Sequence, residues 1–370
     1  MDLADEYRKA EQKLISSCVY CGNCVKHCKM MEEFEPKVNG RETQKSIVRF
    51  LKEGAPLSGD AKRKLDACMR CYGCMDIRCP IGVDSLTINE LVWMKQSKHE
   101  GTAHIYEEHH RIIEETLSAQ EQKRVRDKKM VPGAKIAFFP GCNVYKTPQL
   151  LLHALDLMDY IGEAYSYLPG IEYCCGGGQW GMTQDVGWME EKGRALVQAA
   201  VEAGCDTLVC WCPTCCVYLQ ERIGKITDIP FSVIPMASYL AMHMERFETL
   251  KADQVEHVAV HEPCKAVYRG ISFDGFFQLL SNLSGVTVET MAHQGKETLC
   301  CGCRAVGSLP ELGDAMTEKR LEEAKQAGAD RLITICHFCQ CVLGDYHAKH
   351  PDCGPAVENY ADYLTRLIKE

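Results

Sequence analysis

The chain has 370 residues, of which 46% are hydrophobic and 8% aromatic, so it can bury the cores of two or three domains. Its net charge is -9, with the acidic excess after about residue 130, which gives no reason to expect a nucleic acid partner. No apolar run reaches the ~18 residues of a membrane span, and the charged start is no signal peptide, so we expect no direct membrane span and a cytoplasmic location.

The N-terminal part carries two runs of cysteine with the spacing of a two-cluster ferredoxin. Three cysteines follow one another at intervals of three residues, and a fourth comes a few residues later. The runs are Cys18, Cys21, Cys24 and Cys28, then Cys68, Cys71, Cys74 and Cys79. This spacing suits 4Fe-4S clusters better than zinc, which usually takes two separated pairs. The first function predicted is therefore electron transfer.

Helical periodicity surrounds these runs. The first 17 residues, residues 43–53 and residues 84–98 carry apolar side chains at helical spacing, with Asp84 or Ser85 as N-cap of the last. Residues 103–127 predict one longer helix. The dense charges and Pro132-Gly133 of residues 118–134 predict a domain boundary, and the Lys-rich residues 123–129 predict a solvated linker. We therefore expect a small helical ferredoxin-like domain over residues 1–130.

The remaining chain contains an internal repeat. Residues 135–142 (KIAFFPGC) predict a buried strand that leads to Cys142. Residues 203–215 (AGCDTLVCWCPTC) and 327–339 (AGADRLITICHFC) align without a gap. In each copy a helix, at about 184–203 and 310–327, ends at a glycine before a strand that delivers a pair of cysteines. The repeat predicts two α/β lobes, residues 131–250 and 251–370.

Each copy supplies five thiols in the same order: a single cysteine, a Cys-Cys-Gly motif and a C-x2-C pair. The first copy has Cys142, Cys174, Cys175, Cys212 and Cys215, and the second has Cys264, Cys300, Cys301, Cys336 and Cys339. A reducing cytoplasm keeps thiols free for metals or redox chemistry. With 24 cysteines in the chain, metal ligation is a better explanation of this repeated order than disulfide bonds.

This order of motifs resembles the CCG-domain iron-sulfur subunits of the heterodisulfide reductase family, closest to a subunit that fuses a ferredoxin domain to two CCG lobes. The resemblance covers nearly the whole chain. It implies a noncubane 4Fe-4S cluster in each five-cysteine motif, where a heterodisulfide such as that of coenzyme M and coenzyme B is reductively cleaved. Two cubane 4Fe-4S clusters in the ferredoxin domain would deliver the electrons.

In two-cluster ferredoxins the fourth cysteine of each run serves the other cluster. One cubane set would then be Cys18, Cys21, Cys24 and Cys79, and the other Cys68, Cys71, Cys74 and Cys28. The resemblance also makes the two five-cysteine motifs the ligands of the noncubane clusters. Six cysteines remain for packing or for the surroundings of the clusters: Cys205, Cys210, Cys216, Cys303, Cys341 and Cys353.

Two departures from the family pattern are visible. Four residues separate Cys74 from Cys79 where three are usual, which we interpret as a tolerated loop expansion. Cys303 and Arg304 follow Gly302, where the first copy has further glycines. Cys303 could replace a ligand, or Arg304 could change the charge at the second cluster.

Few side chains other than cysteine are candidates for the chemistry. His261 and Lys265 flank Cys264, and His337 follows Cys336, so these three could supply protons. Arg269 and Arg304 could anchor carboxylates of an anionic substrate. For each of them, a hydrogen bond to a cluster sulfur or a position in solvent is the alternative.

Three functions remain open. The chain could be the disulfide-reducing subunit of a complex, fed by a flavoprotein, a hydrogenase or formate dehydrogenase module, or a membrane cytochrome b. It could instead be an electron relay, resembling the iron-sulfur subunits of anaerobic glycerol-3-phosphate dehydrogenase, glycolate oxidase or benzoyl-CoA reductase complexes. A zinc-stabilised scaffold is the third. Two full five-thiol motifs favour the first, with a small-molecule disulfide as substrate.

Overall fold

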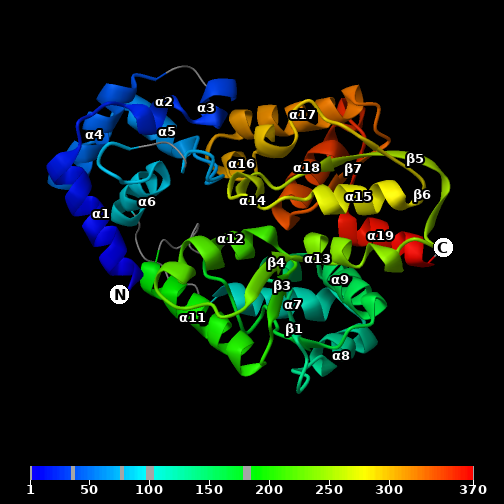
Figure 1. Cartoon of the computed structure of the whole chain (residues 1–370). Coiled ribbons are helices and arrows are strands. Elements are labelled where there is room, and N and C mark those ends of the chain that lie inside the picture. The colour runs from blue at the N-terminus through cyan, green and yellow to red at the C-terminus, as the bar shows by residue number, and fades with distance from the viewer. Residues whose placement is uncertain (1, 35–37, 76–78, 97–103, 178–184, 370) are drawn as a thin grey trace.

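The computed structural model describes residues 2–34, 38–75, 79–96, 104–177 and 185–369. Figure 1 shows a helical N-terminal domain in blue, a first lobe in green and a second lobe in yellow to red. Each lobe is built on one parallel four-stranded sheet. The predicted fold class, a helical domain followed by two repeated α/β lobes, is confirmed.

The N-terminal domain consists of helices joined by the cysteine loops. α1 (Leu3–Ser17), α4 (Gly40–Glu53) and α6 (Ser85–Gln96) contact one another and bury apolar side chains such as Leu14 and Val92. Between them come the short helices α2 (Asn23–Lys26), α3 (Lys29–Phe34) and α5 (Gly59–Asp66). No strand occurs among the described residues before β1.

The helices predicted over 43–53 and 84–98 are present as α4 and α6. Of the two predicted N-caps of α6, Asp84 is the one present, because its carboxylate accepts a hydrogen bond from the Thr87 amide at 2.6 Å. Residues 97 and 98, which the prediction included, lie outside the described residues.

The single helix predicted over 103–127 is wrong. α7 (His104–Thr116) ends before Ser118, whose side chain caps α8 (Ala119–Asp127) in a capping box with Glu121. The side-chain cap starts a new helix, and this local signal outweighs the continuous helical periodicity. Most of the charged stretch predicted as a solvated linker is therefore helical.

These two helices lie against the first lobe. Arg124 of α8 pairs with Asp156 and Asp159 of the first lobe at 2.6 and 3.0 Å, and α7 contacts helices that follow the first strand of that lobe. The domain boundary near residue 130 stays a prediction, with α7 and α8 attached to the lobe that follows it.

The first lobe has strands β1 (Ile136–Phe139), β2 (Tyr165–Tyr167), β3 (Thr207–Cys210) and β4 (Ser232–Pro235), in the order β2-β1-β3-β4. Its helices are η1 (Asn143–Lys146), α9 (Pro148–Ile161), α11 (Val186–Glu202), α12 (Pro213–Glu221), η2 (Ile223–Lys225), α13 (Met236–Met242) and η3 (Met244–Arg246). The chain proceeds outward in opposite directions from β1 and β3, so their carboxyl ends form the switch point where such sheets bind ligands.

The second lobe repeats this plan with β5 (Lys251–His261), β6 (Ser284–Glu289), β7 (Arg331–Thr334) and β8 (Ala356–Asn359), in the order β6-β5-β7-β8. Its helices are α14 (Cys264–Tyr268), α15 (Asp274–Asn282), η4 (Gly295–Glu297), α16 (Ala305–Ser308), α17 (Pro310–Gln326), α18 (His337–Lys349), η5 (Pro351–Cys353) and α19 (Tyr360–Lys369). Phe139 pairs with Cys210 in the first sheet as His261 pairs with Thr334 in the second. This common register defines equivalent positions in the two lobes.

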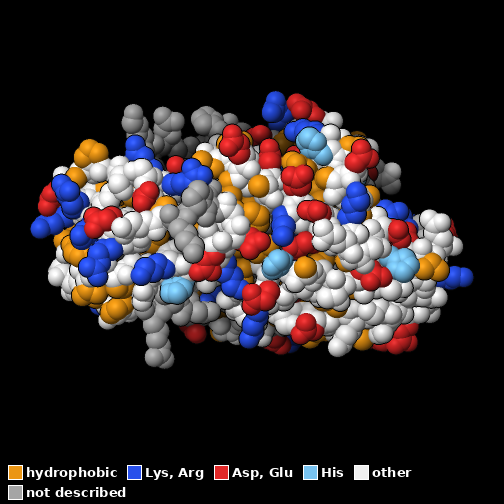
Figure 2. Space-filling model, turned by 90° about the horizontal axis from the view of Figure 1, so that it is seen from above, with side chains coloured by type: hydrophobic (Ala, Val, Ile, Leu, Met, Phe, Trp, Pro, Cys, Tyr) orange, Lys and Arg blue, Asp and Glu red, His pale blue; other side chains and the backbone are white. Residues whose placement is uncertain are grey.

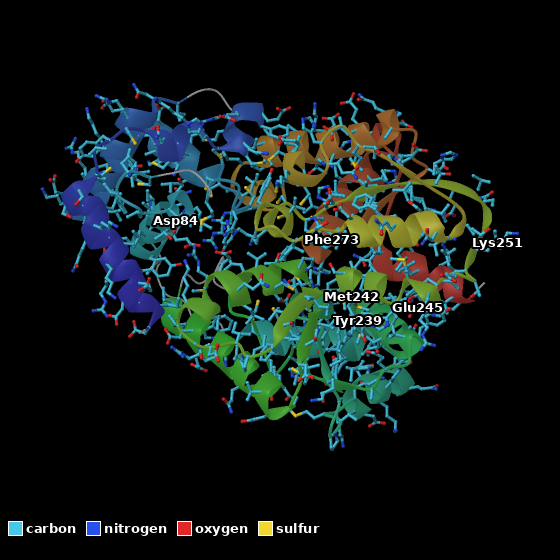
Figure 3. All side chains as sticks on the ribbon, in the orientation of Figure 1. Asp84, Tyr239, Met242, Glu245, Lys251 and Phe273 are labelled. Atoms are coloured by element: carbon cyan, nitrogen blue, oxygen red, sulfur yellow. The ribbon has the colours of Figure 1, made fainter. Side chains whose placement is uncertain are left out.

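In each lobe, a helix near its C-terminal end packs against the other lobe. α19 of the second lobe contacts α9 of the first, and α13 of the first contacts α15 of the second. Figure 3 shows Tyr239 and Met242 of α13 below Phe273, which precedes α15. His153 of α9 also lies 2.6 Å from the carboxylate of Asp362 in α19. These helix contacts join the two lobes to each other.

Charges of both signs are scattered over the face seen in Figure 2. Within the described residues, no helix combines the length and the apolar character needed to cross a membrane.

Candidate functional site

The eight ferredoxin-type cysteines lie in two groups of four. One cavity is lined by Cys18, Cys21, Cys24 and Cys79, which we call the distal set. A second is lined by Cys28, Cys68, Cys71 and Cys74, the proximal set, with Cys24 between the two. Each set joins three cysteines of one run to the last cysteine of the other, the arrangement of a two-cluster ferredoxin. Cys79 reaches the distal set despite the longer spacing after Cys74.

The proximal cysteines are half-buried, and the loss of solvent around their thiols raises the pKa of Cys28, Cys71 and Cys74 above the ordinary value of a thiol. Thiolates at these positions therefore require positive charge nearby. The ammonium of Lys64, itself buried, lowers the pKa of Cys74 and Cys28 in opposition to this burial. Four converging thiols that need positive charge fit a cationic iron-sulfur core.

The first five-cysteine set consists of Cys142, Cys174, Cys175, Cys212 and Cys215, all buried. They follow β1, precede α11 and open α12, at the carboxyl end of the sheet. Cys174 Sγ lies 3.7 Å from Cys142 Sγ and accepts a hydrogen bond from the Gly176 amide at 3.3 Å. Gly176 has φ +78, and a Cβ there would lie 2.6 Å from the Met189 carbonyl oxygen, so only glycine permits this approach.

The second five-cysteine set consists of Cys264, Cys300, Cys301, Cys336 and Cys339. It occupies the same places after β5, before α17 and at the start of α18. The Gly302 amide donates to Cys300 Sγ at 3.4 Å, and Gly302 has φ +83. A sixth thiol, Cys303, interacts with Cys300 and Cys301, at the place that Gly177 takes in the first lobe.

The four sets form a continuous series. Cys71 of the proximal set is close enough to Cys264 and Cys300 to influence their charge. The two five-cysteine sets meet at Cys212 and Cys336, whose thiols interact. Thiols this close share protons, and all of them become thiolates only when a cation binds.

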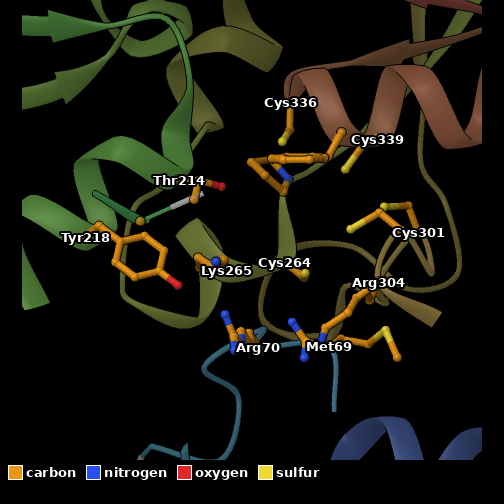
Figure 4. A pocket seen from close by; sticks show the side chains of 15 residues that line it. Met69, Arg70, Thr214, Tyr218, Cys264, Lys265, Cys301, Arg304, Cys336 and Cys339 are labelled. Carbon is orange, nitrogen blue, oxygen red and sulfur yellow. The ribbon is translucent and has the colours of Figure 1, made fainter. Parts of the chain in front are cut away.

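A cavity of about 220 Å³ opens where the three parts of the chain meet (Figure 4). The whole second five-cysteine set lines it, together with Cys303. The first lobe contributes Gly177, Thr214 and Tyr218, and the ferredoxin loop contributes Met69 and Arg70. A molecule in this cavity would touch the thiols of the second lobe and the loop that carries the proximal set.

Three cationic side chains line the same cavity: Arg70, Lys265 and Arg304. The guanidinium carbons of Arg70 and Arg304 lie 4.3 and 4.5 Å from the Trp93 ring centre, a cation-π arrangement that orders both groups. Burial, and then the nearby charge of Arg70, lower the pKa of Arg304. Cations held this close together favour an anion between them.

The structure separates the predicted non-cysteine candidates. Lys265 and Arg304 line the cavity, whereas Arg269 does not and instead donates from Nε to Glu221 at 2.8 Å. His261 is fully buried, with a ring nitrogen within 4.8 Å of the Cys301 and Cys339 sulfurs.

His337 links the two lobes. Its Nδ1 lies 2.6 Å from Asn143 Nδ2 and its Nε2 lies 2.7 Å from Thr147 Oγ1. Burial lowers the pKa of His337 to about 4, so the ring is neutral near pH 7. Two partners from the first lobe make it a positioning residue at the junction of the cysteine sets.

Sequence reasoning missed Arg70, Trp93 and Tyr218. Arg70 stands inside the second cysteine run, in a loop where its own φ is +51, and this basic residue between ligand-type cysteines was an available signal. Tyr218 could not be found in this way. Its ring packs on Gly177, where a Cβ would lie 2.1 Å from the Tyr218 ring. This contact depends on tertiary structure.

Comparison with known proteins agrees with this geometry. Residues 14–83 match the 4Fe-4S dicluster domain family, and residues 136–220 and 258–344 match the cysteine-rich domain family CCG. The chain carries two CCG cysteine-rich domains. It joins two CCG domains to a ferredoxin domain, so the predicted family is confirmed and the protein is an iron-sulfur protein.

Two relatives align with most of the chain. A fumarate reductase (CoM/CoB) subunit of Methanothermobacter marburgensis is 24% identical, over 90% of this CCG protein and 68% of the relative. A dihydromethanophenazine:CoB--CoM heterodisulfide reductase subunit of Methanosarcina barkeri is 23% identical, over 90% and 88%. Among solved structures, a hypothetical protein from Helicobacter pylori aligns with a TM-score of 0.48 and 13% identity, over 92% of this chain and 76% of that one. The relatives support an oxidoreductase-associated role.

Proposed function

We propose that this chain is a disulfide-reducing iron-sulfur subunit of the heterodisulfide reductase kind. The distal and proximal sets would each hold a cubane 4Fe-4S cluster, and each five-cysteine set a noncubane one. Electrons would enter at the distal set and pass through the proximal set to the second lobe. The electrostatic interaction of Cys71 with Cys264 and Cys300 supports this order.

The observation that carries the proposal is the cavity at the second five-cysteine set. All five cysteines of that set line it beside Arg70, Lys265 and Arg304. A cluster held by these cysteines would fill part of the cavity, but a pure relay site does not need three cationic side chains on the same wall, whereas a site for an anionic substrate does. We therefore assign the reduction to the second lobe.

The bound clusters would supply the electrons and the coordination of sulfur needed to cleave a disulfide. The chain's own residues would bind and orient the substrate. Arg70 and Arg304, ordered on Trp93, would hold an anionic group such as a carboxylate, sulfonate or phosphate. Lys265, whose Nζ lies 4.6 Å from the Tyr218 ring centre, is suited to deliver a proton to a leaving thiolate.

The electrons would come from another subunit, because the chain offers metal-type sites rather than a dinucleotide motif. A flavoprotein, a hydrogenase or formate dehydrogenase module, or a membrane cytochrome b would dock at the N-terminal domain. Val19, beside Cys18 of the distal set, is 60% exposed. This leaves the distal set near the surface that such a donor would reach.

A turnover assay tests this function. Iron-loaded protein is reduced with a viologen and given the heterodisulfide of coenzyme M and coenzyme B, or a neutral disulfide such as bis(2-hydroxyethyl) disulfide. We expect viologen oxidation with the anionic disulfide and much less with the neutral one. No turnover with either, at full iron content, would reject substrate reduction and leave the electron-relay function.

A further inference from the structure

The two lobes differ at three equivalent core positions. The first lobe has Phe139, Leu196 and Ala199, and the second has His261, Arg320 and Glu323. Phe139 and His261 end the equivalent strands β1 and β5, and the other two pairs lie on the helices α11 and α17. All six side chains are at most 4% exposed. The same fold thus contains an apolar core under one five-cysteine set and a polar network under the other.

The polar network is connected from the cysteines outward. Arg320 Nε donates to His261 Nδ1 at 3.2 Å, and its terminal nitrogens bond to Glu323 and to the Met291 sulfur. The second oxygen of Glu323 lies 2.6 Å from His293 Nδ1. At the inner end, a ring nitrogen of His261 lies within 4.8 Å of the Cys301 and Cys339 sulfurs.

Stability does not explain this network. Removing an arginine and a glutamate from water is unfavourable, and well-packed apolar residues commonly serve a core as well or better. The first lobe demonstrates the point inside the same molecule, because Leu196 and Ala199 fill the equivalent core positions. The network therefore serves the site above it.

Arg320 also fixes the tautomer of His261. A guanidinium only donates, so Nδ1 must accept and the ring proton must be on Nε2. A ring nitrogen of His261 faces the Cys301 and Cys339 sulfurs, and hydrogen bonding from neighbouring thiols and from the His261 side chain lowers the pKa of the Cys339 thiol. A protonated nitrogen has no lone pair for iron, but it donates well to a sulfur. His261 thus presents an N-H to the sulfur side of the second five-cysteine set, where sulfur of a bound cluster or of Cys339 can accept it.

We propose that His261, held by Arg320 and Glu323, is a positioning residue that donates a hydrogen bond to the iron-sulfur site of the second lobe and raises its reduction potential above that of the first lobe. Hydrogen bonds to the sulfurs are a known control of cluster potential. The inference rests on the proposed function only in assuming that both lobes bind clusters. It makes the second lobe, beside the cavity, the favoured place for electrons to accumulate.

The test is a redox titration of the complete, iron-loaded protein followed by EPR. The triple variant His261→Phe, Arg320→Leu and Glu323→Ala copies the first lobe and leaves no half of the buried ion pair behind. At a fixed applied potential, we expect the ratio of reduced to oxidised second-lobe site to fall about tenfold, which is ~59 mV for one electron. Phe139→Leu, the matched control in the first lobe, should leave the reduction potential of the second-lobe site unchanged.

Other results overturn the inference. The inference is wrong if the triple variant keeps its full iron content and the reduction potential of the second-lobe site does not change. It is also wrong if the potentials of all sites change equally. If the triple variant does not fold, pulsed EPR of wild-type protein carrying ¹⁵N-histidine decides instead. Weak coupling fits a hydrogen-bonded nitrogen, and strong coupling means that His261 is a ligand. If wild-type protein turns over the disulfide but the triple variant shows no shift in reduction potential, this inference alone is rejected. If the potential shifts but wild-type protein does not turn over the disulfide, the proposed substrate is rejected.

Discussion

Arg222 Nη2 lies 2.8 Å from Glu90 Oε2, and both side chains are buried between the N-terminal domain and the first lobe. Tyr7 of α1 donates to the same carboxylate oxygen at 2.6 Å. The Arg222 guanidinium carbon also lies 5.8 Å from the ring centre of Tyr72, which follows Cys71. This ion pair thus holds the loop of the proximal set against the lobes.

Breaking this pair should loosen the docking of the N-terminal domain. Glu90→Gln leaves the buried charge of Arg222 without its counter-ion, which costs about 3–5 kcal/mol. We expect a lower melting temperature and slower electron transfer from the cubane sites to the lobes, measured by stopped-flow reduction. The double variant Glu90→Leu and Arg222→Met should recover most of the stability. A single variant as stable as wild type would contradict this account.

Two serine variants test the crossed cubane sets. Cys79→Ser should remove the cluster of the distal set, and Cys28→Ser that of the proximal set, because each cysteine lines the cavity of the other run. Each variant should lose about four iron atoms and one of two cubane EPR signals, a different one in each case. If the runs are crossed, Cys79→Ser should lose the same signal as Cys21→Ser, and Cys28→Ser the same signal as Cys71→Ser. A Cys79→Ser variant that instead loses the signal of Cys71→Ser would show that the runs are not crossed.

Cys303→Gly tests the sixth thiol of the second lobe. Glycine stands at the equivalent position of the first lobe, where the backbone of Gly177 hydrogen-bonds to Cys175. We expect this variant to keep its iron, because the five common thiols are sufficient, while Cys300→Ser should lose the second-lobe iron. Iron loss with Cys303→Gly equal to that with Cys300→Ser would make Cys303 a required ligand.

The pair of arginines on Trp93 should control affinity for charge. Arg304→Gln removes one cation from the cavity wall and should raise KM for an anionic disulfide about tenfold, with little change for a neutral one. Arg269→Gln is the matched control, because Arg269 is paired with Glu221 outside the cavity. Equal effects of Arg304→Gln on both disulfides would mean that it does not contact the anionic group.

The sequence predicted the parts that depend on local pattern or repetition. Cysteine spacing predicted the sets, and the repeat predicted two similar lobes, because each copy contains the same strand, helix and glycine signals. The break at Ser118 was missed, since a capping box competes with periodicity over only a few residues. Arg320 was also missed, although alignment of the two copies places it opposite Leu196.

Other features depend on tertiary structure. Arg70, Trp93 and Arg304 are distant in sequence and meet only when the ferredoxin loop docks on the second lobe. The sequence likewise gives no sign that His337 is bonded on both ring nitrogens by the first lobe. A position next to a cysteine therefore did not distinguish Lys265, which lines the cavity, from His337, which first-lobe side chains hold.

The most direct test of the central claim is EPR with iron quantitation while a disulfide is added to the reduced protein. If the second lobe reduces substrate, a paramagnetic signal should appear only when the disulfide is present, and Cys336→Ser should abolish it while both cubane signals remain. The same spectrum with and without disulfide, at full iron content, would contradict the claim that substrate reacts at the second five-cysteine set.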